Sequence, residues 1–377
     1  MKKTKTTNLL FFALNLVGAG ISSSAWADSG DYKIDTRLKT FQANNAVSVD
    51  QFDAEFMNYS PKNGQLFALG ENSLAVEVQR SAWSFTAYRK QEIFINAGRD
   101  TGQLYADINS RVAPTSDKAY AVDFDGYGID QTGIGIGYTF ELAGLSNNQK
   151  LSVRPALRVY NINQYREIQA KGNVEALADG SYNIGINTVE RDTEGDFTFP
   201  SGPNPKGMGY ALDLNLLWRA TDDLQLYGVV QDLWNNNTIK NAPSTVQRLN
   251  SNVSQFDQDG FLNYSPAIQG QNSRPEYVFG LPTKTTLGLE YAINNTIVSG
   301  AGFEVRHIAG LTMPKALVQL NSPWSWIEGF ELGYEGYFGT YELATYFKYG
   351  GVRIGFDTLD DEKRRVEYLE FLLNFRL

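Results

Sequence analysis

The chain of 377 residues contains no cysteine and only one histidine. The lack of cysteine excludes disulfide scaffolds, zinc-thiolate sites, iron–sulfur clusters and cysteine nucleophiles. A single histidine cannot form a multi-histidine metal site. Basic residues are also in deficit, because 33 Lys and Arg stand against 42 Asp and Glu and leave a formal net charge of −9. This balance predicts no nucleic-acid partner, since nucleic-acid binding needs a basic face.

Long hydrophobic runs are confined to the first 27 residues. Three lysines lie within the first five positions, an apolar stretch covers residues 9–21, and Ala25-Trp26-Ala27 places small residues at the cleavage positions. This pattern is typical of a secretory signal peptide, so we predict export and a mature chain that starts at Asp28. Beyond Asp28 no apolar run approaches the roughly 18 residues that a membrane-spanning helix requires.

The remaining sequence alternates apolar and polar residues with a period of two, as β-strands do. In the last strand Leu369, Phe371, Leu373, Phe375 and Leu377 fall on one face, while Glu370, Asn374 and Arg376 fall on the other. Similar alternation covers 134–140, 151–159, 212–216, 287–292, 330–338 and 352–357. Runs of about 10 alternating residues match tilted membrane strands and are longer than the usual strands of soluble sandwiches. Aromatic residues, 13% of the chain, are expected as girdles at the membrane interfaces.

The turns fall into two classes. Short turns are predicted at 143–150, 220–223, 294–296 and 349–351, and long loops at 162–207, 234–283 and 359–365. If the C-terminus is periplasmic, counting strands backward places these short turns in the periplasm and the long loops outside. Only the short turn at Gly339-Thr340 departs from this division. Outer-membrane barrels have the same asymmetry.

The predicted fold is all-β, a transmembrane antiparallel up-and-down β-barrel of about 14–16 strands with long extracellular loops. Residues 73–377 are expected to form the barrel, with candidate strands at 73–80, 82–89, 91–97, 103–110 and 118–125 in its first part. Residues 28–72 are expected to form either a periplasmic or plug segment or the first strands.

In this pattern the chain resembles the outer-membrane β-barrel proteins of Gram-negative bacteria. The closing motif Phe371-x-Leu373-x-Phe375-x-Leu377 is similar to the C-terminal signal read by the barrel-assembly machinery. That signal usually ends in Phe or Trp, whereas this chain ends in Leu377. The resemblance implies an outer-membrane location, with outer-membrane lipid as a partner and the assembly machinery as a partner during biogenesis. It leaves the oligomeric state open.

If the apolar faces meet lipid, the polar faces line the interior. The candidate lumen-lining residues are Arg154, Arg158, Asp213, Glu290, Glu304, Arg306, Glu331, Glu335, Glu342, Lys348, Arg353, Asp357, Glu370 and Arg376. They are compatible with a charged, water-filled path for solutes and equally with a salt-bridged interior that supports the wall. A row of glycines at 133, 135 and 137 would leave room for a plug or a permeant, or would permit sharp curvature.

No cofactor is predicted. Asp123, Asp125 and Asp130 cluster near a predicted outer loop and could hold a calcium ion through their carboxylates. Their spacing misses the EF-hand pattern, so an ordinary Asp/Gly turn is the favoured interpretation.

Three functions remain open. A pore or channel for solutes is favoured by the charged inner faces, and a role in adhesion, envelope organisation or secretion is suggested by the long outer loops. An outer-membrane hydrolase is the least favoured. His307 lacks the Ser two residues later and the neighbouring Asp that the known barrel hydrolases pair with histidine, and it shares the lipid-facing row of Phe303 and Val305.

Overall fold

The computed structural model describes residues 32–49, 59–61, 64–109, 118–143, 149–177, 182–197, 199–251, 254–256, 262–264, 268–360 and 362–377. The predicted signal peptide and the mature N-terminus at Asp28 lie outside these ranges.

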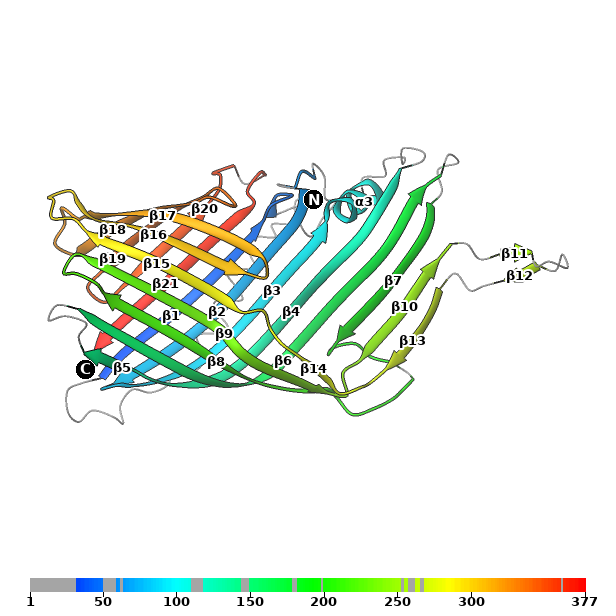
Figure 1. Ribbon diagram of the computed structural model, residues 1–377, viewed down its shortest axis with the longest axis horizontal. Helices are drawn as coiled ribbons and strands as arrows, with labels where there is room; N and C mark the ends of the chain where they lie inside the picture. The colour runs from blue at the N-terminus through cyan, green and yellow to red at the C-terminus, as the bar shows by residue number, and fades with distance from the viewer. Residues whose placement is uncertain are drawn as a thin grey trace, which may run out of the picture.

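The main body is a closed antiparallel barrel of 14 strands (Figure 1). In ring order these are β1 (Tyr32–Asn44), β2 (Gln65–Arg80), β3 (Trp83–Gly98), β4 (Ala119–Tyr138), β6 (Lys150–Ala176), β8 (Lys206–Arg219), β9 (Leu224–Lys240), β15 (Lys284–Ala292), β16 (Val298–Ile308), β17 (Leu311–Asn321), β18 (Ile327–Glu335), β19 (Thr340–Phe347), β20 (Gly350–Phe356) and β21 (Val366–Arg376). The ring closes where β21 pairs with β1, with Phe371 opposite Leu38. This confirms the predicted fold class.

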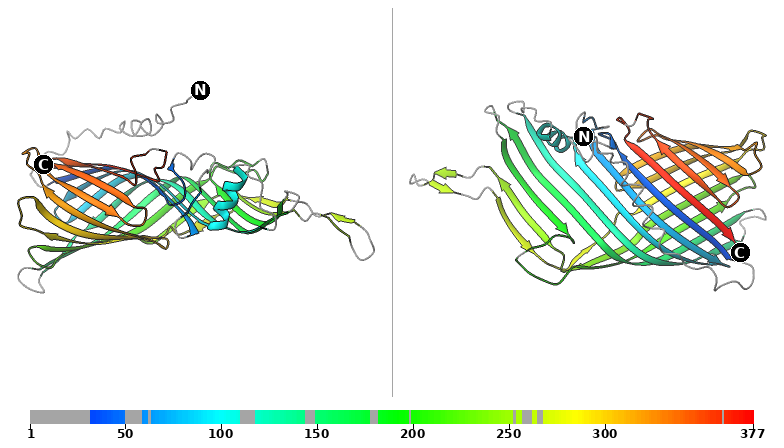
Figure 2. Two further views of the ribbon diagram at one scale, coloured as in Figure 1. Left: turned by 90° about the horizontal axis from the view of Figure 1, so that it is seen from above. Right: turned by 180° about the vertical axis from the view of Figure 1, so that it is seen from behind.

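A second sheet continues from the barrel wall, and we call it the outer extension. Above residue 166, β6 leaves β8 and pairs with β7 (Tyr182–Asp192), which pairs with β10 (Ser244–Asn250), which pairs with β13 (Ile268–Ser273). Short strands β5 (Phe140–Ala143) and β14 (Tyr277–Phe279) add to β6 and β9, and β11 (Ser254–Phe256) pairs with β12 (Leu262–Tyr264). Helix α3 (Arg99–Asn109) packs beside the outer part of β4 (Figure 2).

The two ends of the barrel differ. One end, the short-turn end, carries the connections 81–82, 220–223, 293–297, 322–326 and 348–349, together with the C-terminus. The other end, the long-loop end, carries the outer extension and α3, and the short turns 309–310 and 336–339 are among its described connections. Outer-membrane barrels have the same asymmetry, with their short turns in the periplasm.

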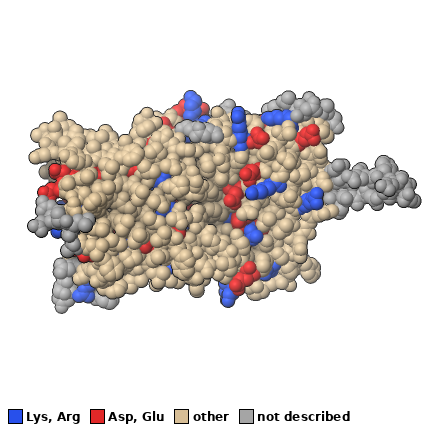
Figure 3. Space-filling view, in the orientation of Figure 1, with Lys and Arg blue, Asp and Glu red and all other residues tan. Residues whose placement is uncertain are grey.

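The outward face of the ring is apolar. Side chains such as Ile134, Leu289, Leu332 and Phe371 are exposed on it, and Figure 3 shows one side of the barrel wall nearly free of charge, while charged side chains gather over the outer extension. Aromatic pairs, including Trp83 with Tyr138 and Trp326 with Phe347, mark the short-turn end. These are the outward rows and interface girdle expected of a membrane barrel. In the described part of the chain, no helix is long and apolar enough to cross a membrane.

Several predicted boundaries were wrong. Residue 73 lies within β2, and residues 82–97 form one strand rather than two. Residues 103–110 were predicted as a strand, but 99–109 form a helix. Much of the predicted loops 162–207 and 234–283 is strand, because β6, β7, β9 and β10 continue into the outer extension.

Candidate functional site: the interior of the barrel

The alternation along β3 distinguishes the two faces of the wall. Phe85 and Ile93 point outward and are 51% and 53% exposed, whereas Lys90 and Glu92 point inward and are buried. The same alternation continues through the Cα partners on β2 and β4. Charged groups therefore line the bore, where each needs an ionic or hydrogen-bonding partner.

One ion pair crosses the bore, from the outer end of β15 to the middle of β3. The Lys284 Nζ on β15 lies 2.6 Å from Glu92 Oε1 on β3. Between these two strands the ring holds β4, β6, β8 and β9, so their side chains can meet only through the interior (Figure 2). The same Nζ lies 3.0 Å from Asp232 Oδ2, and all three side chains are almost fully buried.

The pair continues along the wall as a connected network. Arg158 contacts Asp232 through Nη2 and Asp213 through Nε, both at 2.6 Å, and Lys90 Nζ lies 2.8 Å from Glu92 Oε1. Asp232 has a left-handed backbone with φ of 56°, next to the register shift between β8 and β9. Irregularities of this kind redirect a side chain, and here the Asp232 carboxylate is placed between Lys284 and Arg158.

A second crossing joins β16 to β2. The Arg306 Nη2 lies 3.7 Å from Glu71 Oε2, which also accepts a hydrogen bond of 2.8 Å from Lys39 Nζ. These strands lie directly opposite each other in the ring, separated by six others on either side. Two independent contacts thus connect opposite walls at the level of the charged layer.

The short strands carry a third cluster around Arg353. Its guanidinium lies 3.0 Å from Glu331, 3.5 Å from Glu342 and 3.9 Å from Glu370. Lys315 extends the cluster, with Glu304 and Glu342 each at 3.4 Å. Arg353 and Lys315 are each shared by two or more acids, so this part of the interior is ion-paired.

An apolar layer lies on the long-loop side of the charged layer. Phe94, Leu69 and Ile308 are the next inward residues after Glu92, Glu71 and Arg306. They join one buried cluster that draws on both walls, with Ala43, Leu311, Met313, Phe338 and Val366. A second cluster rich in aromatic rings adjoins it through Tyr127 and contains Tyr160, Tyr165, Tyr277 and Phe279. On the way from the long-loop end to the two crossings, a solute would therefore pass aromatic and aliphatic surface, with the Glu167–Arg191 ion pair at its edge.

The aromatic cluster is held by polar contacts at its edge. Arg191 lies over the ring of Tyr277, with 4.1 Å from its guanidinium carbon to the ring centroid. Glu167 accepts hydrogen bonds from the Tyr277 hydroxyl at 2.7 Å and from Arg191 Nη1 at 2.9 Å. These contacts connect β14, which pairs with β9, to β6 and β7.

The structure brings most of the predicted lumen residues together. Arg158, Asp213, Glu304, Arg306, Glu331, Glu342, Arg353 and Glu370 belong to the three clusters, and Arg154 pairs with Glu77 at 2.6 Å. Glu290 lies on the same row of β15 as Lys284, nearer the short-turn end.

Four predicted lumen residues lie outside the clusters. The carboxylates of Glu335 and Asp357 accept backbone hydrogen bonds in the connections that follow β18 and β20. The Lys348 Nζ lies in a short turn, 5.1 Å from the ring centroid of Tyr349. Arg376 is the last residue of β21, and its Cα partner on β1 is Lys33. All four occupy the ends of strands rather than the middle of the bore.

The sequence reasoning missed Lys39, Glu71, Lys90, Glu92, Asp232 and Lys284, and so both residues of the first crossing and the Glu71 partner of Arg306 in the second. A signal was present on β3, because Ser84, Thr86, Tyr88, Lys90 and Glu92 form one continuous polar row. Dividing residues 82–97 into two strands concealed this row.

The glycine row at 133, 135 and 137 provides space for neighbouring side chains. A Cβ at position 133 would lie 2.6 Å from Tyr160 Cβ, and one at 135 would lie 3.3 Å from Arg158 Cγ. The row therefore lets Tyr160 and Arg158 lie against the β4 backbone, and the space expected for a plug or permeant is filled by these side chains.

The candidate calcium ligands do not converge. Asp123 and Asp125 lie on the inward row of β4, while Asp130 lies on the outward row, where its carboxylate binds Arg89 Nη2 at 2.8 Å. The described residues contain no group of three acidic or histidine side chains placed to hold a metal ion. His307 is exposed on the outside, and its Nδ1 lies 3.0 Å from Thr312 Oγ1.

Comparison with known proteins gives structural likeness at low identity. No protein-family model matches the chain, and no curated protein matches it. The toluene transporter TodX of P. putida is 9% identical, with a TM-score of 0.40 over 92% of this chain and 89% of that one. A Pseudomonas aeruginosa FadL homologue is 8% identical, with a TM-score of 0.27 over 92% and 90%. The protease OmpT of Escherichia coli is 8% identical, with a TM-score of 0.25 over 92% and 97%.

The chain has the fold of an outer-membrane β-barrel protein. At these scores no site or activity of those proteins transfers to it. The assignment rests on the closed ring and on the apolar outward rows.

Proposed function

We propose that this protein is a channel of the Gram-negative outer membrane, exported through its signal peptide and closed in the conformation described here. The observation that carries the proposal is the charged layer of the bore, in which Lys284 and Arg306 reach across to Glu92 and Glu71. Buried ion pairs are seldom more stabilising than apolar packing of similar volume. An interior whose only task was to support the wall would be served as well by apolar side chains, so retained charge favours a path that admits water.

The solute class follows from the order of the layers. A molecule arriving from outside would pass Tyr165, Tyr277 and Phe279, with the Glu167–Arg191 pair at their edge, before it reached the two crossings. Aromatic surface favours a solute with an apolar or aromatic body, and the ion-paired layer beneath favours one that also carries a polar group. We therefore propose an amphipathic small molecule.

Planar-bilayer recording and proteoliposome uptake test the proposal. The wild-type barrel should show rare openings, and Lys284→Met should open more often because one crossing is lost. Uptake of 4-hydroxyphenylacetate should exceed that of gluconate, which carries the same charge without an aromatic ring. A folded barrel that never conducts, in either form, contradicts the channel proposal, and equal uptake of the two anions contradicts the solute class.

The outer extension favours a second function, adhesion to or binding of a partner outside the cell. Strands β7, β10 and β13 are not part of the ring, so they are available for a role other than closing it. Deleting 244–273 removes β10 and β13 and retains β9 and β14. This deletion should abolish partner binding and leave conductance unchanged if the extension is a separate binding module.

A further inference from the structure

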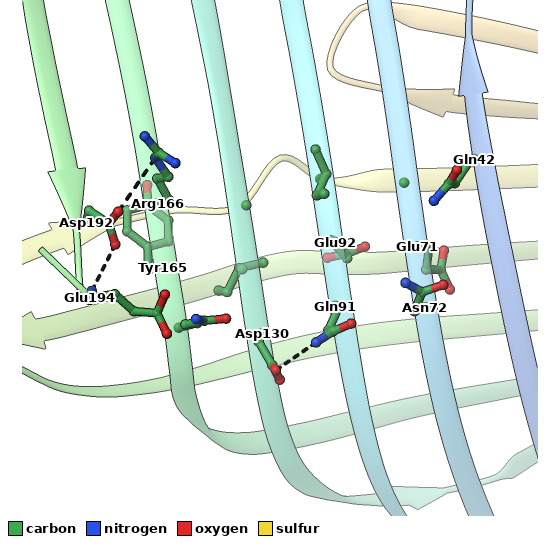
Figure 4. Close-up of a pocket in the computed structure, with 15 residues that line it drawn as sticks. Gln42, Glu71, Asn72, Gln91, Glu92, Asp130, Tyr165, Arg166, Asp192 and Glu194 are labelled. Atoms are coloured by element: carbon green, nitrogen blue, oxygen red, sulfur yellow. Dashed lines mark hydrogen bonds and ion pairs between the residues drawn. The ribbon is translucent and has the colours of Figure 1, made fainter. Parts of the chain in front are cut away.

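A polar groove lies on the outside of the barrel, on the wall formed by β1, β2, β3, β4 and β6. Its volume is about 370 Å³. We call it the outer groove and define it by Asn72, Gln91, Asp130, Gln164, Arg166 and Asp192. Figure 4 shows Gln91 and Asp130 directed toward each other, with Arg166 and Asp192 joined beyond them.

The face of the wall follows from the strand alternation. Gln91 shares the row of Phe85 and Ile93 on β3, and Asp130 shares the row of Ile134, which is 67% exposed, on β4. Glu92 alternates with Gln91 and enters the bore instead. The groove side chains are therefore on the surface that faces the membrane, not on the channel lining.

The height of the groove places it where the apolar band ends. Asn72, Gln91, Asp130 and Gln164 are successive Cα partners and form one polar row across four strands. On the short-turn side, this row is followed by Arg89, Thr132 and Asn161 and then by apolar outward residues such as Val76 and Ile134. On β18 and β19, across the barrel, the outward positions stay apolar to the outer strand ends at Tyr334 and Tyr341. A polar row across four strands, at the upper limit of the apolar band, indicates a site for a lipid headgroup.

The chemistry of the groove favours neutral hydroxyl groups. The Asp130 carboxylate accepts hydrogen bonds from Arg89 at 2.8 Å, from Gln91 at 3.0 Å and from Asn163 at 3.0 Å. Arg166 is paired with Glu190 at 2.9 Å and with Asp192 at 3.6 Å. Both guanidinium groups are thus neutralised, which disfavours an anionic phosphate. The amides can both donate to and accept from sugar hydroxyls, and the paired carboxylates accept hydrogen bonds from them.

We propose that the outer groove binds a sugar ring in the headgroup of an outer-leaflet glycolipid. Glycine makes the room for it. A Cβ at Gly128 would have its nearest neighbour at 3.8 Å, an ordinary contact with Ile93 Cγ1, so a larger side chain can be placed there without displacing the backbone. Gly128→Leu therefore fills the groove, whereas Ala87→Leu adds similar bulk to the outward row of β3 within the apolar band and serves as the matched control.

Native mass spectrometry of the full barrel in detergent, titrated with purified lipopolysaccharide, measures the binding. Parallel titrations use phosphatidylglycerol and the free core oligosaccharide. We expect Gly128→Leu to bind lipopolysaccharide at least about tenfold more weakly than the wild type, the loss expected when two or three ordinary hydrogen bonds cannot form. Ala87→Leu should bind as the wild type does, and phosphatidylglycerol binding should not change in either variant.

Gln91→Ala removes one groove amide without adding bulk. It tests the groove independently if the Gly128→Leu variant does not fold. It should weaken lipopolysaccharide binding several-fold while the heat-modified gel mobility stays normal. Unchanged lipopolysaccharide binding in both groove variants overturns the proposal, as does an equal loss of phosphatidylglycerol. Oligosaccharide that binds as tightly as lipopolysaccharide overturns the lipid source. Because the groove lies outside the bore, none of these outcomes depends on whether the barrel conducts.

Discussion

Removing the charge of Lys284 should destabilise the barrel more than any single change at its surface. The Lys284→Met variant keeps the aliphatic chain but removes the ammonium group that lies 2.6 Å from Glu92 and 3.0 Å from Asp232. Breaking a buried ion pair typically costs about 3–5 kcal/mol, because the partner is left as an uncompensated buried charge. Here each carboxylate keeps a second base, Lys90 at 2.8 Å and Arg158 at 2.6 Å. We therefore expect the lower limit, about 3 kcal/mol.

Urea unfolding of the barrel in lipid vesicles, followed by tryptophan fluorescence, measures this loss. Lys348→Met is the matched control, because Lys348 is exposed in a short turn, and it should change the free energy of unfolding by less than about 0.5 kcal/mol. A double-mutant cycle with Glu92→Gln should give a coupling energy of about 0.5–3 kcal/mol. If Lys284→Met and Lys348→Met unfold at the same urea concentration, the crossing does not hold the walls together and the reasoning is refuted.

Three further predictions test other parts of the account. Gly133→Leu forces its Cβ to within 2.6 Å of Tyr160 Cβ, and it should lower the free energy of unfolding by about 1–3 kcal/mol in the same urea assay. His307→Ala should leave the free energy of unfolding unchanged, and any lipid or peptide hydrolysis measured for the wild type should be the same in the variant. Loss of such an activity in the variant would support the hydrolase hypothesis. Burial raises the pKa of Asp107, but hydrogen bonds, first among them the one from Tyr120, outweigh it and hold that pKa below its ordinary value. The stability that Asp107 gives to α3 is therefore present above the ordinary pKa and is lost as the pH falls through the lowered one. Hydrogen exchange of the α3 amides should speed up over that acidic range in the wild type, and a rate as pH-independent as that of Asp107→Asn would contradict this.

The barrel wall was predictable because one physical rule governs it. A strand that separates lipid from a polar interior must alternate, and the last strand shows this from Leu369 to Phe375. The division into short turns and long loops also followed from the sequence. Both features are local, so no knowledge of distant contacts was needed.

Helix α3 shows where local alternation misleads. Leu104, Ala106 and Ile108 alternate as a strand would, yet Gln103 donates a 2.7 Å hydrogen bond to Asp107, four residues away on the same helix face. Short apolar alternation cannot distinguish a strand from one face of a helix that packs on its neighbours.

The ion pairs of the bore could not be assigned from sequence for a different reason. Glu92 and Lys284 are 192 residues apart, and their contact depends on ring closure and strand tilt. Even if alternation had placed Glu92 and Lys284 in inward rows, the sequence could not say which wall each residue faces. The outer groove depends in the same way on which strands lie side by side.

Cross-linking across the bore tests most directly whether side chains from opposite walls meet there. The chain has no cysteine of its own, so only the introduced cysteines can react. A Glu92→Cys, Lys284→Cys variant, treated with a short bismaleimide in vesicles, should form an internal cross-link that shifts its gel mobility. The Ile93→Cys, Lys284→Cys variant should not, because position 93 points outward one residue away. Equal cross-linking of the two variants, or none in either, would contradict a bore joined by side chains from opposite walls.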